Sequence, residues 1–165
     1  MNPEAKLQKL FGEVKEENKE TFSKMEQYGK LLNDKYLGFV NKLDSYFRSK
    51  CPSQVKWLED NTVQTQQGPQ LKDPSKRQEL EKTVESFRTC IEKSDNGAET
   101  LLRKFEEDSE NVYRKFSDGI QSCTKFSNDS EIKSCFKNLV VENADDTQRL
   151  YQYFDSQINE FSKKF

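Results

Sequence analysis

Apolar residues recur at steps of three or four along almost the whole chain, and this spacing limits the fold more than any other feature. Such steps place an apolar stripe on one face of an α-helix. The first run extends from Leu7 to Phe47, with one interruption at Asn18. A run of this length exceeds the usual globular helix, so we expect a long curved helix or a break near LLNDKYLG.

The remaining sequence contains several shorter helical stretches. From Cys51-Pro52 onward we predict, in order, a short helix around 55–58 and a polar loop at QTQQGPQLKD. A helix then restarts at Asp73-Pro74, with its apolar face over 80–91, and ends or kinks at Gly97, before a helix with its face over 101–120. A short helical segment over 132–139 follows, and NADD caps a last helix with its face over 150–161. The fold class that follows is all-α, as an elongated bundle of five or six helices stapled by two disulfides. We expect a single helical domain over 1–165, with a long N-terminal helical region over 3–50 and a disulfide-linked helical region over 51–165.

The core must be narrow, because only 32% of the residues are hydrophobic while 34% are charged. Aromatic side chains bury large areas, so a few of them can hold such a core together. Nine phenylalanines fall on one side of the helices by phase: Phe11, Phe22, Phe39, Phe47, Phe87, Phe105, Phe116, Phe154 and Phe161. They either pack on one another or line a cavity for a hydrophobic ligand between helices.

The charges argue against two classes of partner. Lys and Arg number 27 and Asp and Glu number 29, well mixed along the chain, so we expect no nucleic-acid binding. We also expect no membrane span, because no apolar run approaches about 20 residues. The first ten residues, MNPEAKLQKL, lack the apolar stretch of a signal peptide. If the protein is secreted, we expect this sequence to be that of the mature chain.

Four cysteines, Cys51, Cys90, Cys123 and Cys135, stand in a chain without histidine. The even count favours two disulfides, with reduced core cysteines as the first alternative. A four-thiolate metal site is the second alternative, but the cysteines lack the closely spaced pairs of structural zinc sites. We therefore expect no metal and no cofactor.

Helix geometry disfavours one of the three pairings. If the helices before and after Gly97 form a hairpin, Cys90 and Cys123 are separated by on the order of 35 Å, whereas bridged Cα atoms lie about 4.4–6.8 Å apart. We prefer Cys51–Cys90 with Cys123–Cys135, and the pairing of Cys51 with Cys123 and Cys90 with Cys135 stays open. Between the last two cysteines lies Asn128-Asp129-Ser130, an acceptor sequon for glycosylation at Asn128 in a secreted protein, or a turn and helix cap.

The acidic pairs do not resemble catalytic carboxylates. Clusters such as Glu106/Glu107/Asp108 and Asp145/Asp146 lie among lysines, as expected for solvated helix faces. The absence of histidine removes the common nucleophile–base pairs, so we expect no enzyme. Half-exposed tyrosines at 46, 113, 151 and 153 are better candidates for contact with a protein, because tyrosine combines a large apolar area with a polar tip.

Three segments, FRTCIEK (Phe87–Lys93), VYRKFSDGIQSCTKF (Val112–Phe126) and EIKSCFKNL (Glu131–Leu139), carry a resemblance to a known group. There the chain resembles four-cysteine helical secreted proteins of insects, among them salivary proteins of blood feeders such as the C-terminal domain of the aegyptin type. The acidic, Gly-rich N-terminal region of that type is missing here, so collagen binding does not carry over. The resemblance implies a scavenger or inhibitor of a host haemostatic, complement or immune protein.

The main hypothesis is therefore a secreted, extracellular, non-enzymatic protein that binds another extracellular protein. One alternative is a carrier of a hydrophobic small ligand. The other is an intracellular helical scaffold with reduced thiols.

Overall fold

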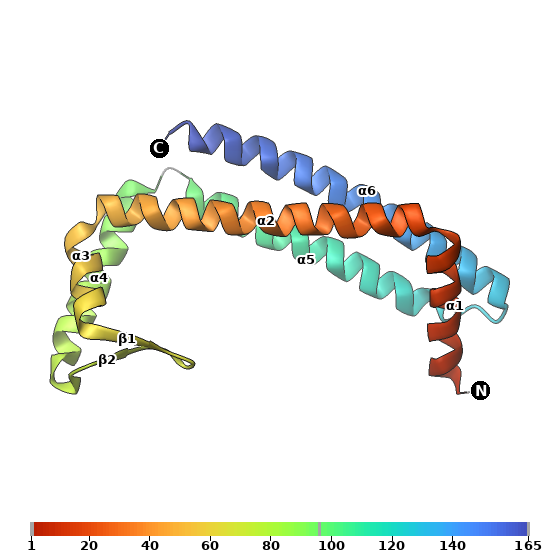
Figure 1. Ribbon diagram of the computed structural model, residues 1–165, viewed down its shortest axis with the longest axis horizontal. Coiled ribbons are helices and arrows are strands. Elements are labelled where there is room, and N and C mark those ends of the chain that lie inside the picture. The colour runs from red at the N-terminus through yellow and green to blue at the C-terminus, as the bar shows by residue number, and fades with distance from the viewer. Residues whose placement is uncertain (1, 96, 165) are drawn as a thin grey trace. The chain divides into compact units, whose positions relative to one another are not determined.

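The computed structural model describes residues 2–95 and 97–164, and they form six α-helices, one short 3-10 helix and one β-hairpin (Figure 1). The elements are, in chain order, α1 (Pro3–Glu17), α2 (Lys19–Lys50), α3 (Pro52–Asn61), β1 (Thr62–Thr65), β2 (Gly68–Leu71), η1 (Pro74–Lys76), α4 (Arg77–Ser94), α5 (Ala98–Cys123) and α6 (Asp129–Ser162). The all-α class, the six helices and the two disulfides confirm the prediction.

Local side chains decide where several helices begin and end. The side chains of Asn2 and Asn128 accept hydrogen bonds from backbone N–H groups in the first turns of α1 and α6. The break between α1 and α2 lies at Asn18, whose amide donates to the Val14 carbonyl over 2.8 Å, and α2 continues unbroken through LLNDKYLG. Gly97 separates α4 from α5 with a φ of 93°, which glycine adopts without strain.

Two sequence predictions were wrong. The expected loop QTQQGPQLKD contributes to the hairpin, in which β1 and β2 are antiparallel and Thr65 pairs with Gly68. Gly68 supplies a φ of 102° at the turn, and the Thr65 hydroxyl donates to the Gly68 carbonyl over 2.6 Å. The expected separate helices over 132–139 and 150–161 are one helix, because the buried stripe of α6 continues through Ala144 and Thr147.

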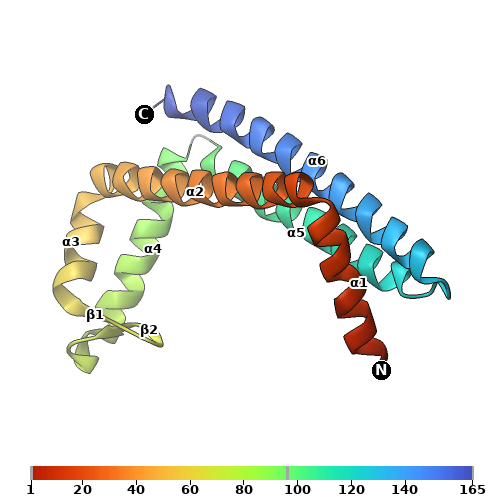
Figure 2. The same ribbon diagram turned by 45° about the vertical axis from the view of Figure 1, so that its right-hand side comes forward.

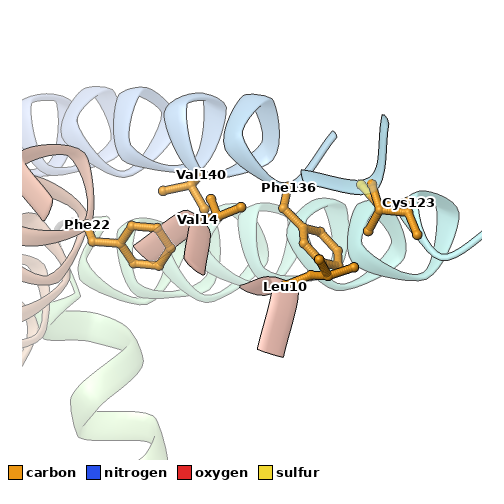
Figure 3. Packing of buried hydrophobic residues seen from close by; sticks show 7 residues of the cluster. Leu10, Val14, Phe22, Cys123, Phe136 and Val140 are labelled. Carbon is orange, nitrogen blue, oxygen red and sulfur yellow. The ribbon is translucent and has the colours of Figure 1, made fainter. Parts of the chain in front are cut away.

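The chain divides into two compact units, and the expectation of a single domain stays a prediction. The first unit comprises residues 1–37 and 100–163, and so contains α1, the first part of α2, most of α5, and α6. The helices α5 and α6 lie side by side and run in opposite directions (Figures 1 and 2). Its main core cluster consists of Leu10, Val14, Phe22, Cys123, Ile132, Phe136 and Val140. Figure 3 shows side chains of α1 and α2 pointing toward Phe136 and Val140 of α6.

The second unit comprises residues 38–99 and 164–165. Within it α3 and α4 lie side by side, with the hairpin connecting their far ends through η1 (Figure 2). Cys51, buried at the start of α3, is bonded to Cys90 of α4. Lys76 donates to the Asn61 side chain over 2.9 Å, and the Tyr46 hydroxyl donates to the Ser94 carbonyl over 3.2 Å.

Candidate functional site

A groove of about 440 Å³ runs along the seam between α5 and α6 in the first unit, and it is open to solvent. Its residues fall at helical repeats on both sides: Lys104, Asp108, Asn111, Val112 and Lys115 on α5, and Asp146, Arg149, Leu150 and Tyr153 on α6. These spacings place each set on one helix face. The first part of α2 packs elsewhere on the two helices, with Tyr36 stacked on Phe105 and Tyr28 against Tyr151.

Apolar atoms of three side chains lie in the groove. Leu150 is almost fully buried and Val112 is half-buried, while Tyr153 is 40% exposed. The rings of Tyr153 and Phe154 form a T-shaped pair with 5.2 Å between centroids, and the Lys104 ammonium lies 5.4 Å from the Tyr153 ring centre. These two contacts favour the observed position of the ring, in which Tyr153 offers apolar surface to a ligand.

Two lysines of the groove are neutralised by carboxylates. Lys104 lies 3.0 Å from Asp108, one turn further along α5. Lys115 connects the two helices, because its ammonium lies 3.0 Å from Asp146 of α6. A hydrogen bond to the neighbouring aspartate raises the pKa of each lysine, and the negative charge of that aspartate raises it further. Both ammonium groups therefore stay charged and paired at neutral pH.

Arg149 differs from these lysines. Its guanidinium is exposed and forms no ion pair or hydrogen bond with any residue that the structure describes. Its positive charge reaches the same region as Lys115, since it acts to lower the pKa of that lysine against the larger effect of Asp146. The groove thus combines an apolar surface, two neutralised lysines and one available guanidinium, an arrangement that can hold a large side chain together with an acidic group.

The four predicted cysteines form the preferred pairs. The Cα atoms of Cys51 and Cys90 lie 6.1 Å apart, and those of Cys123 and Cys135 lie 5.5 Å apart. The second pair joins the end of α5 to α6, with Cys123 fully buried in the core cluster. Each disulfide therefore joins two neighbouring helices close to one end of each pair.

Asn128 caps α6, since its side-chain oxygen accepts a 2.8 Å hydrogen bond from the Ser130 N–H. Its amide nitrogen, the atom that carries an N-linked glycan, is not used by the cap, and the residue is exposed. The cap and the glycosylation predicted for Asn128 are compatible with each other.

The phenylalanines and tyrosines singled out in the sequence lie in different environments. None of the nine phenylalanines is exposed, and several contact one another: Phe11 meets Phe22 edge-on at 5.6 Å, and Phe105 meets Phe154 at 4.7 Å. Of the four tyrosines, Tyr113 is 71% exposed and Tyr153 is 40% exposed, while Tyr46 and Tyr151 are half-buried. The tyrosines are thus at least partly available, as predicted.

The charged residues of the groove were missed as a site, because Asp108 and Asp146 were interpreted as parts of solvated acidic clusters. The available signal was the stripe 146, 149, 150 and 153, which places polar and apolar residues on the same helix face. Nothing in the sequence indicates that this face lies opposite Lys104 and Lys115.

The fold and the groove define a class: an all-α protein with two disulfides and an open, amphipathic seam between its last two helices. Comparison of the chain with protein-family models, curated proteins and solved structures finds no match. Within the described ranges, no helix is both long and apolar enough to cross a membrane, and no group of three or more acidic or cysteine side chains is placed to hold a metal ion.

Proposed function

We propose that the protein is secreted and acts without catalysis, by binding another extracellular protein. The observation that carries this proposal is the α5–α6 groove, in which Tyr153 and Val112 present apolar surface beside the Arg149 guanidinium, which pairs with none of the described residues. Partly exposed aromatic residues next to arginine are typical of the residues that dominate binding energy in protein interfaces. An open seam also suits a protein surface better than a small molecule, which is normally enclosed by its pocket.

The two disulfides support an oxidising compartment, since such bonds persist mainly in secreted proteins. The resemblance to salivary proteins of blood feeders adds the finer part of the proposal. On that basis the partner is a host haemostatic, complement or immune protein, and the protein is its scavenger or inhibitor.

The compartment is tested by alkylating the denatured, unreduced protein from its natural source and measuring its intact mass. No thiol should react. Reaction of all four cysteines in material that never met a reductant would contradict secretion and favour the intracellular scaffold.

The partner is tested by presenting the immobilised protein to fractionated plasma proteins, then measuring the dissociation constant of each purified candidate. A partner should bind wild type and lose affinity for Tyr153→Ala. A variant at an exposed residue of the second unit, Val63→Ala, serves as control. If no candidate binds measurably, and native mass spectrometry finds an apolar ligand retained by the protein, the carrier replaces the present proposal.

A further inference from the structure

The charge balance of the groove indicates what its partner presents. Three cationic side chains and two carboxylates line it, which leaves one positive charge. That charge belongs to Arg149, because Lys104 and Lys115 are each 3.0 Å from an aspartate. Glu142, which does not line the groove, also lies 3.9 Å from Lys115, so Arg149 is the lining cation to which no described carboxylate is paired.

A partner that covers the seam must place a negatively charged group next to the Arg149 guanidinium. Removing a guanidinium from water without an opposite charge is strongly unfavourable, so a partner lacking an acid at this point would be rejected. The planar guanidinium pairs best with a carboxylate, through two parallel hydrogen bonds.

The two ion pairs make the groove a poor fit for a highly charged ligand. A nucleic acid or an anionic membrane presents many negative charges at short spacing, but Lys104 and Lys115 are already paired with Asp108 and Asp146, so only Arg149 is available to them. A single carboxylate beside an apolar side chain matches this one available cation. The exposed ring of Tyr153 and the side chain of Val112 lie in the same groove to receive that apolar side chain.

We propose that the α5–α6 groove binds a protein segment in which an Asp or Glu stands close to an aromatic or leucine side chain, with Arg149 pairing the carboxylate and Tyr153 contacting the apolar group. This inference rests on the proposed function, because it names the chemistry of the partner. A free aromatic carboxylic acid shares that chemistry, but the open seam would leave much of so small a ligand in water.

The test uses a random-peptide display library panned against the full-length, disulfide-bonded protein. Enriched peptides should contain an acidic residue near an aromatic residue or leucine. A synthetic enriched peptide should lose about tenfold or more in affinity for Arg149→Glu, because a charge-assisted bidentate pair is lost. Replacing the peptide's acidic residue with lysine should restore binding to Arg149→Glu.

The control is Arg77→Glu, which makes the same change in net charge at a residue of the second unit whose side chain is 82% exposed. It should leave peptide affinity within twofold. Backbone amide shifts of the labelled protein on titration should be largest around Arg149 and Tyr153. Circular dichroism and the absence of reactive thiols establish that each variant is folded.

Three outcomes would overturn the inference: enriched peptides without an acid, equal weakening by Arg149→Glu and Arg77→Glu, or no enrichment at all. Binding of a simple aromatic acid such as phenylacetate, as tightly as the peptides, would overturn it in favour of a small-molecule site. A plasma partner that binds wild type and Arg149→Glu equally would reject this groove chemistry while leaving the proposed function intact. Failure of the proposed function itself is recognised separately, by reactive thiols and the absence of any protein partner.

Discussion

A β-carbon on Gly119 of α5 would overlap the side chain of Leu139 on α6, so the two helices are in close contact at this point. Leu139 packs against the core cluster of the first unit, and this limits where its side chain can move. The glycine thus helps to set the register between the two helices that form the groove.

Gly119→Ala should destabilise the protein by about 1–2 kcal/mol, because overpacking outweighs the gain in helix propensity. The same substitution should become stabilising in a Leu139→Ala background, where the space is free. Chemical denaturation of the four proteins of this double-mutant cycle checks the prediction. Gly29→Ala is the control, since nothing lies within 4 Å of its added carbon, and it should stabilise by up to about 1 kcal/mol. Equal stabilisation by both alanines would show that the contact does not matter.

Phe136→Ala should cost about 3–5 kcal/mol, because the side chain is 2% exposed and its loss leaves a cavity in the core. Its ring meets Phe11 edge-on, with 5.4 Å between centroids. Phe126→Ala is the matched control, since this ring is 47% exposed, and its cost should stay within about 0.5 kcal/mol. Urea unfolding midpoints compare the two, and similar losses would contradict the assignment of the core.

Removing the disulfides should have unequal effects. Cys51 and Cys90 are 39 residues apart and Cys123 and Cys135 are 12 apart, so the chain-entropy model gives losses of about 4 and about 3 kcal/mol for paired alanine substitutions. Loss of the first bond should reduce hydrogen-exchange protection mainly in α3 and α4. Loss of the second should reduce it at the α5–α6 turn. Protection lost first in the other unit would contradict this division.

Glycosylation at Asn128 can be separated from helix capping. Ser130→Ala should abolish the glycan in a secretory expression host while keeping the cap, because the cap uses the backbone N–H of residue 130. Asn128→Ala should abolish both, with a further loss of about 1 kcal/mol in stability measured on glycan-free protein. The intact mass of the secreted protein reports the glycan. If secreted wild type has the mass of the unmodified polypeptide, the predicted glycosylation is rejected.

Lys133 should make stability depend on alkaline pH. The ammonium lies 2.7 Å from Glu17 and 3.3 Å from Glu13 of α1, and the hydrogen bond to Glu17 raises its pKa, with Glu13 adding to the effect. Because the pKa of Lys133 is higher in the folded state than in the unfolded state, its pairing with Glu17 and Glu13 stabilises the fold fully below the unfolded-state pKa of about 10.4. This stabilisation is lost as the pH rises through the folded-state pKa. Lys133→Met should therefore be less stable than wild type at pH 7, and the difference should shrink toward pH 11. Lys163→Met, at an exposed pair near the end of α6, should show a smaller difference at pH 7.

Much of the local structure was predictable because it depends on neighbours in the chain. Proline after Cys51 and glycine at 97 mark helix ends through backbone sterics alone. The distance along a helix also sufficed to disfavour Cys90–Cys123. The sequence pattern was misleading in two places. At 62–71 the polar composition suggested a loop, although β1 contains the β-branched residues Thr62, Val63 and Thr65. At NADD a good capping sequence lies inside α6, because the buried stripe of that helix continues past it.

The sequence by itself therefore determined the helical class, several helix ends and much of the aromatic core, because these follow from backbone preferences and from the period of the helix. The set of nine phenylalanines omitted Phe136, which lies in the main core cluster. Only the tertiary structure decided which cysteines pair, that Lys115 meets Asp146 across two helices, and that Arg149, beside Tyr153, pairs with no residue in the described ranges. Those relationships depend on the rotation and register of α5 against α6, which are set by side-chain packing between residues far apart in the sequence, such as Gly119 with Leu139 and Phe105 with Phe154.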